Sequence, residues 1–122
     1  MRLTLAFFII CAIAPATFAS EKGKLIYSTS CKNCHAPNVS KAINSPAAFD
    51  KKAWDKRFKQ AKIEVKENPS KYKSPMDYML AKVKNGKGLM YHGGLCSESN
   101  TQNINFSDDA LIEAINFMSK RE

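Results

Sequence analysis

The segment from Cys31 to His35 holds the densest group of reactive side chains in this 122-residue sequence. Two cysteines are separated by two residues, and a histidine follows the second one immediately. The pattern C-x-x-C-H is typical of covalent attachment of a c-type haem. Two thiols spaced in this way can each add to a vinyl group of the porphyrin, and the adjacent imidazole can bind the iron. We therefore predict that Cys31 and Cys34 form thioethers and that His35 is the first axial ligand.

Other uses of the cysteine pair stay open at this point. A thioredoxin-like dithiol needs a βαβ context, and strand signals are nearly absent. A simple disulfide is a second alternative. A zinc site could combine Cys31 and Cys34 with His92 and Cys96, and it would make the protein a colourless interaction module. Structural zinc usually takes two closely spaced ligand pairs, however, and H-x-x-x-C is an unusual second pair.

A haem protein that carries electrons needs a second axial ligand, and a methionine thioether raises the reduction potential relative to a second histidine. We predict Met90, because it follows a glycine-rich stretch whose backbone can approach a flat ring. Met76, Met79 and Met118 fall on apolar helix faces, where core packing explains them. His92 is the rival ligand. An open sixth position would instead indicate a haem peroxidase or a gas sensor.

The N-terminus is typical of a secretory signal peptide, which we place at residues 1–19. It has a positively charged start, an uncharged apolar run over 3–14 and small residues before Ala19. The apolar run is shorter than the about 20 residues that span a bilayer. Cleavage after Ala19 would remove Cys11 and leave a single domain, 20–122, in the periplasm, with no transmembrane segment.

The cysteine count favours a cofactor in the mature domain. A chain of about 100 residues buries only a modest core and usually needs a disulfide, a metal or a cofactor to stabilise its fold. Cys31, Cys34 and Cys96 are an odd number, so a complete disulfide framework is impossible. Cys96 is then a buried thiol, a dimer link or a regulatory thiol. We expect a monomer, with a Cys96-linked dimer as the alternative.

Helical periodicity recurs in four segments, which predicts an all-α fold with long loops. Ser74 and Ser107 can cap helices, Pro75 suits a first helical position, and Gly86 suits a helix end. The expected helices cover about 21–30, about 51–66, 75–85 and 108–118, and an extended loop covers 86–106. The expected buried faces carry Trp54, Phe58, Ala61 and Val65, then Met76, Met79, Leu80 and Val83, and finally Leu111, Ala114, Ile115 and Met118.

Over nearly all of the mature chain, the sequence resembles a class I c-type cytochrome, and the cytochrome c5 group is the most similar. The motifs that carry the resemblance are Gly23-Lys-Leu-Ile-Tyr27, C-x-x-C-H at 31–35, Ala53-Trp54 with Arg57, Val83-Lys-Asn-Gly-Lys-Gly-Leu-Met90, and Asp108 to Met118. The resemblance implies a small helical fold of about four helices around one covalently bound haem, with His35 and Met90 on opposite haem faces.

The resemblance also assigns supporting roles. Gly23 and Tyr27 would contact the last helix near Ala114 and Phe117, where the first and last helices cross. The carbonyl of Pro46 would fix Nδ1 of the proximal histidine, a bond that orients the ring. Trp54 and Arg57 would belong to a helix along the haem edge. Members of the c5 group often carry two cysteines after the methionine, whereas this sequence has only Cys96 there.

The charge is strongly asymmetric. The chain carries 19 Lys and Arg against 11 Asp and Glu, for a net charge of +8, and the positive excess lies within residues 21–87. Weak redox encounters use small interfaces and electrostatic steering, so we expect redox partner proteins with acidic docking faces. The alternative is that the lysines bind no partner and only keep the exposed faces of the helices in contact with water. The sequence has no stretch that combines aromatic and basic residues, so it gives no indication of nucleic-acid binding.

No group of residues has the pattern of a catalytic site. The sequence offers no paired carboxylates, no nucleophile with a base and no phosphate loop. The expected function is therefore that of an electron carrier rather than an enzyme. The iron would cycle between Fe(II) and Fe(III) as single electrons pass between periplasmic or membrane-bound redox proteins.

Overall fold

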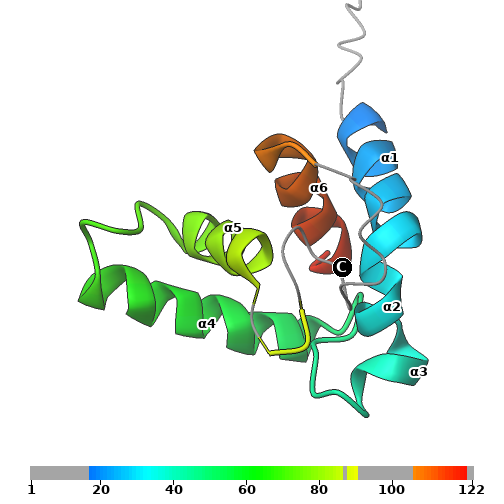
Figure 1. The fold of residues 1–122 in the computed structure, drawn as a ribbon, viewed down its shortest axis with the longest axis horizontal. Coiled ribbons are helices and arrows are strands. Elements are labelled where there is room, and N and C mark those ends of the chain that lie inside the picture. Colours follow the sequence, from blue (N-terminus) through cyan, green and yellow to red (C-terminus); the bar gives the residue numbers. More distant parts are fainter. Residues whose placement is uncertain (1–16, 87, 91–105, 121–122) are drawn as a thin grey trace, which may run out of the picture.

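The computed structural model describes residues 17–86, 88–90 and 106–120, with side chains from Glu21 onward. Within these ranges the chain is helical and forms no sheet, which confirms the all-α prediction (Figure 1). The elements in chain order are α1 (Thr17–Ile26), the π-helical turn η1 (Tyr27–Cys31), α2 (Lys32–His35), α3 (Pro37–Ser40), α4 (Lys51–Glu67), α5 (Pro75–Asn85) and α6 (Asp108–Met118). None of the described helices is long and apolar enough to cross a membrane.

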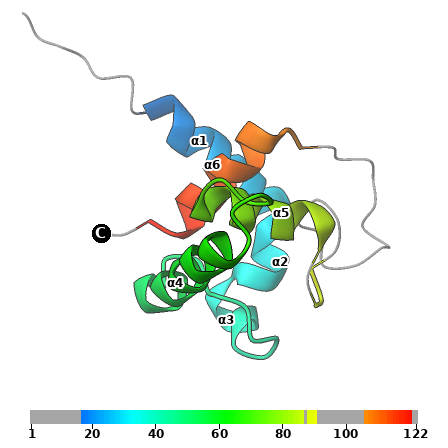
Figure 2. The same cartoon turned by 90° about the vertical axis from the view of Figure 1, so that its left-hand side faces the viewer.

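Helices α1 and α6 lie against each other, as both ribbon views show (Figures 1 and 2). Their backbones approach so closely at Gly23 that a Cβ atom there would collide with the Glu113 carbonyl oxygen and with Cβ of Phe117. The rings of Tyr27 and Phe117 pack with their centroids 5.6 Å apart. The predicted crossing of the first and last helices is therefore confirmed, and glycine is required at position 23 because no other residue lets the backbones meet.

Helix α5 turns back along α4 to form a hairpin (Figure 1). Both helices start where capping chemistry predicts. Asp50 accepts a hydrogen bond from the Ala53 amide at 3.0 Å, and Ser74 Oγ accepts one from the Asp77 amide at 3.1 Å. Gly86 follows α5 with a φ of 78°, a left-handed conformation that glycine adopts without steric cost. Each end of these helices lies within about one residue of the sequence-based expectation.

Two hydrophobic clusters hold the helices together. The first joins α1, η1, α4 and α6, and its buried members include Ile26, Trp54, Ala114, Ile115 and Met118. The second is smaller and lies within the α4–α5 hairpin, where it is formed by Ala61, Tyr72 and Tyr78. The helix faces expected to be apolar all point inward: their residues are buried or half-buried throughout.

The N-terminal helical region is longer than expected. Helical structure runs from Thr17 through η1 and α2 to His35, whereas the sequence predicts a helix over about 21–30. The side-chain hydroxyls of Ser28 and Thr29 donate to carbonyls of the preceding turn, at 2.9 Å for the shortest contacts. These bonds accompany a π turn, an irregularity often found beside functional sites. The short helix α3 is also absent from the sequence-based expectation, because four residues are too few to show periodicity.

Candidate functional site

A cavity of about 370 Å³ opens where α2, α4, α5 and α6 meet, and its wall includes Cys34, His35 and Met90. The fold thus brings the end of the C-x-x-C-H motif together with a methionine that lies far along the chain. Cys31 does not line this cavity. It is 8% exposed and belongs to the first hydrophobic cluster, one helical turn before Cys34.

His35 is held by the segment that follows α3. Its Nδ1 atom lies 2.7 Å from the Pro46 carbonyl oxygen, so the predicted hydrogen bond between them is confirmed. The Ala48 amide donates to the His35 carbonyl, also at 2.7 Å. An Nδ1–H that donates to Pro46 leaves Nε2 with its lone pair, which is the tautomer that an iron ligand needs.

The electrostatic surroundings keep this imidazole neutral. Burial lowers the pKa of His35 below its ordinary value; the hydrogen bond to Pro46 opposes that effect, and the positive charge of Arg57 adds to it. Ligation requires the neutral ring, because a protonated imidazole has no lone pair to offer. The cavity therefore favours the protonation state that binds a metal.

Residues 44–48, which carry the Pro46 carbonyl, are anchored to α4. Nε1 of Trp54 donates to the Ala47 carbonyl at 2.8 Å, and an Arg57 guanidinium nitrogen donates to the Asn44 carbonyl at 3.1 Å. The Trp54 ring also stacks on His35, with the ring centroids 5.8 Å apart and the planes inclined by 28°. Trp54 and Arg57 thus support the histidine through the backbone of this segment.

The two cysteines of the motif are in different states. Cys34 is disulfide-bonded, so its thiol would have to be released by reduction before it could form a thioether. Cys31 carries a free thiol, and burial raises its pKa to about 11. Such a group stays protonated at neutral pH, whereas a thioredoxin-type cysteine is activated by a lowered pKa. The surroundings of Cys31 therefore do not support a redox dithiol.

The cavity wall is largely apolar and includes two residues that the sequence assigns only to the core. Met79 and Met118 face the cavity, together with Trp54 and Ile115. Periodicity places Met79 and Met118 on inward faces but does not distinguish a packed core from a cavity. Its polar part includes Arg57, Gln60 and Lys82. This distribution suits a flat apolar ring that carries charged substituents at one edge.

Met90 lies at the end of a short described segment. It is half-buried and lines the cavity, whereas the preceding Leu89 is 59% exposed. Gly88 has a φ of 61°, which glycine adopts without the steric strain that other residues would have there.

His92 and Cys96, on which the rival ligand and the zinc alternative depend, lie outside the described residues. Within the described residues, no three His, Cys, Asp or Glu side chains gather in a way that could hold a metal ion.

Comparison with known proteins identifies a family. Residues 19–118 match the family model described as cytochrome c oxidase, cbb3-type, subunit III. No curated protein and no solved structure matches the chain. The match covers most of the sequence, and it agrees with the all-α fold and with a largely apolar cavity that contains Cys34 and His35. The chain therefore belongs to this family and is a cytochrome c domain, a domain whose cofactor is covalently bound haem c.

Proposed function

We propose that this protein is a mono-haem electron carrier in which Cys31 and Cys34 form the thioethers and His35 and Met90 are the axial ligands. The observation that carries the proposal is the placement of Met90 in the wall of the same cavity as His35, whose ring is oriented by Pro46. Haem, when bound, supplies a single-electron Fe(II)/Fe(III) couple. A thioether opposite a histidine keeps the iron six-coordinate, so that a carrier rather than a peroxidase or a gas sensor results.

The chain's own residues would serve this function in three ways. Pro46 orients the ring of His35, and its hydrogen bond strengthens the ligand. Ile115 and Met118, both nearly fully buried, exclude water from the cavity. Arg57 and Lys82 line the cavity as cations and suit the two carboxylates of a haem.

The proposed site of action is the periplasm, reached through a signal peptide at residues 1–19. The family match begins at residue 19, close to the proposed cut after Ala19. Helix α1 begins at Thr17, so cleavage would remove its first residues and leave a domain over 20–122. Membership of the cytochrome c5 group and a monomeric state belong to the same proposal.

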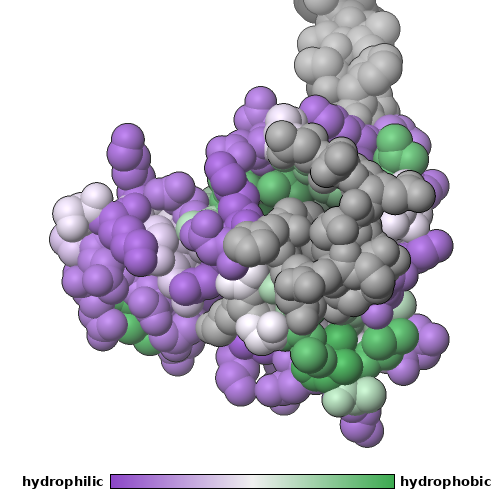
Figure 3. Space-filling view, viewed as in Figure 1, coloured by the Kyte–Doolittle hydropathy of each residue, from purple (hydrophilic) through white to green (hydrophobic). Residues whose placement is uncertain are grey.

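Docking of redox partners is proposed at the cavity mouth. Leu89 is exposed beside Met90, and apolar residues gather on the visible surface near α3 (Figure 3). The chain's net charge of +8 favours an acidic partner. If docking is steered by charge, the rate of electron transfer to an acidic partner should fall as salt increases. A flat salt response, measured by stopped-flow kinetics, contradicts steering.

Absorption spectroscopy of the haem-loaded protein tests the ligand set. The wild type should give a c-type spectrum with the weak red-end band of methionine bound to Fe(III), and Met90→Ala should abolish that band. Met79→Leu and Met118→Leu are the matched controls, because they replace the other methionines of the cavity with residues of similar volume.

Each outcome of this experiment is decisive. Loss of the band in Met90→Ala alone supports the proposed ligation. If the band persists in Met90→Ala and disappears in a control, a different methionine binds the iron. If the wild type has no such band, the sixth ligand is His92 or the position is open, and the carrier proposal gives way to a bis-histidine carrier, a sensor or a peroxidase.

A further inference from the structure

Six lysines form a stripe along helix α4, and all six are exposed. We call this set the lysine stripe; its members are Lys51, Lys52, Lys56, Lys59, Lys62 and Lys66. At about 1.5 Å per residue the stripe is roughly 22 Å long. Two acidic residues lie between the first and the last of these lysines. Asp55 forms an ion pair with Lys51 at 3.1 Å, and Glu64 accepts a hydrogen bond from Gln60. Among the described residues, no ion pair is recorded for the other five lysines.

The lysine stripe lies on the side of α4 opposite the cavity. Successive residues of an α-helix are turned by about 100°, so the six lysines fall within one arc of less than half the circumference. Trp54, Arg57 and Gln60 line the cavity and fall on the opposite arc. The strongest concentration of positive charge is therefore turned away from the redox site.

This geometry argues against a redox partner as the occupant of the lysine stripe. Electron transfer is fast only when the two cofactors come close together. A protein seated on the stripe would be separated from the cavity by α4 itself, which with its side chains is about 10 Å across. A redox protein is better served by the cavity mouth, where Leu89 is exposed beside Met90.

The composition of the lysine stripe suits an anionic lipid surface. Ile63 lies within the same arc and is 41% exposed, so an apolar side chain stands among the lysines. Clusters of four to eight basic residues on an amphipathic helix are typical of proteins that bind acidic headgroups, and an apolar residue among them can enter the headgroup region. A straight stripe on one helix also matches a flat partner better than a curved one.

We propose that the lysine stripe binds an anionic phospholipid surface and holds α4 flat on the membrane, with the cavity facing the aqueous side. The export assigned under the proposed function gives the protein access to such a surface, but the binding itself does not depend on the haem ligands. A carrier held in this way moves in two dimensions along the membrane while its redox cavity stays open to partners.

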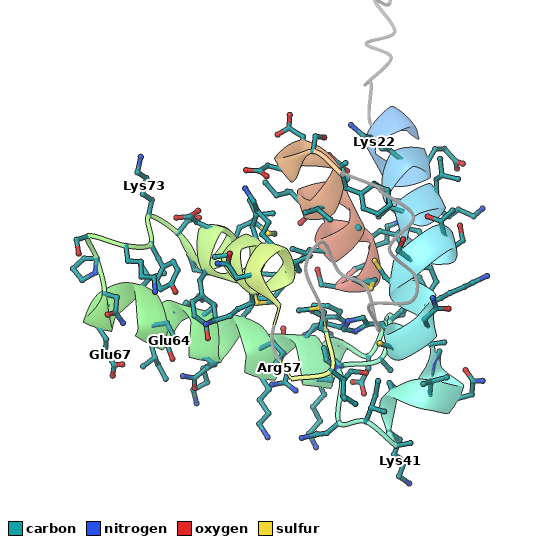
Figure 4. All side chains as sticks on the ribbon, in the orientation of Figure 1. Lys22, Lys41, Arg57, Glu64, Glu67 and Lys73 are labelled. Carbon is teal, nitrogen blue, oxygen red and sulfur yellow. The ribbon has the colours of Figure 1, made fainter. Side chains whose placement is uncertain are left out.

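Vesicle co-sedimentation of the haem-loaded, signal-cleaved protein tests the proposal. Vesicles of equimolar phosphatidylglycerol and phosphatidylcholine should sediment the protein at low salt, and vesicles of phosphatidylcholine alone should not. The triple variant Lys52→Gln/Lys59→Gln/Lys66→Gln should lose roughly fivefold in partitioning for each lysine removed. The control variant Lys22→Gln/Lys41→Gln/Lys73→Gln removes the same charge from exposed lysines on other elements and should retain most of the binding (Figure 4).

The orientation has its own readout. A small soluble reductant should reduce the haem of the vesicle-bound protein as fast as that of the free protein, because the cavity faces away from the lipid. Equal losses in the two triple variants would mean that only net charge matters, and the proposal would be wrong. It would also be wrong if anionic vesicles bound no protein, or if the stripe variant slowed electron transfer to an acidic protein and left vesicle binding intact.

Discussion

The two hydrophobic clusters differ in the distance along the chain from which their members come. Tyr27 and Phe117, which pack against the first cluster, touch each other although they lie ninety residues apart along the chain, and Gly23 lets α1 approach α6 at Glu113. The cluster of the α4–α5 hairpin joins Ala61, Tyr72 and Tyr78, which are close neighbours in sequence. The first surrounds the cavity wall and depends on the global fold, whereas the second can form locally.

Cations cover aromatic rings at both clusters. At the first, Nζ of Lys120 lies 4.8 Å from the centre of the Phe117 ring. In the hairpin, Nζ of Lys71 lies 5.2 Å from the centre of the Tyr72 ring, and Nζ of Lys82 lies 5.0 Å from that of Tyr78. The hairpin thus uses its surplus of lysines to cover two aromatic rings, an arrangement that stabilises each ring by about 0.5–1 kcal/mol at exposed positions. The second cluster is thus built from contacts within the hairpin, although α4 and α5 also contribute residues to the cavity wall.

Breaking the first cluster should have the largest effect. Gly23→Val places a side chain against the Glu113 carbonyl and Phe117, and we expect a loss of about 3 kcal/mol in the free energy of unfolding. Urea denaturation of the haem-loaded protein measures it. Gly88→Ala is the control, because no atom lies within 4 Å of a Cβ there, and only the cost of its positive φ, about 1–2 kcal/mol, remains. Equal losses in the two variants would show that the helices do not cross as described.

Weakening the second cluster should have a smaller and local effect. Tyr72→Leu removes the edge-to-face contact with Tyr78, whose ring centroid is 5.1 Å away, and should cost about 1 kcal/mol. Amide hydrogen exchange should become faster in α4 and α5 but not in α1 and α6, and the absorption spectrum should stay unchanged. Uniform acceleration across all helices would show that the hairpin and the site form one cooperative unit.

The smallest effect concerns pH. Burial raises the pKa of Tyr78, and the charges of Glu64 and Tyr72 raise it further, while Arg57 opposes them. The folded state then holds the phenol proton more tightly than the unfolded chain, whose tyrosine pKa is about 10. This contribution to stability is complete below that pH and is lost as the pH rises through the folded pKa. Urea denaturation above pH 10 should therefore show a steeper decline for the wild type than for Tyr78→Phe; parallel curves would contradict the assignment.

Elements whose signals are local could be predicted from the sequence. Ser74, Pro75 and Gly86 delimit α5, and Ser107 delimits α6, because a cap acts within three residues of its position. The crossing at Gly23 and the Pro46 contact came from the resemblance to a family, not from local signals. The π turn η1 and helix α3 could not be predicted, because a single irregular turn leaves no periodic pattern.

Sequence by itself determined the helical class, the ends of α4 and α5, the start of α6, the C-x-x-C-H motif and the excess of lysines, since these follow from the order of residues over short spans. Only the tertiary structure decided that Met90, Met79 and Met118 all reach the cavity of His35, and that Cys31 is packed beside that cavity instead of lining it. It also decided that the lysine stripe faces away from the cavity. The physical reason is that each of these relations depends on the angle at which whole helices pack, which long-range contacts determine and no local pattern encodes.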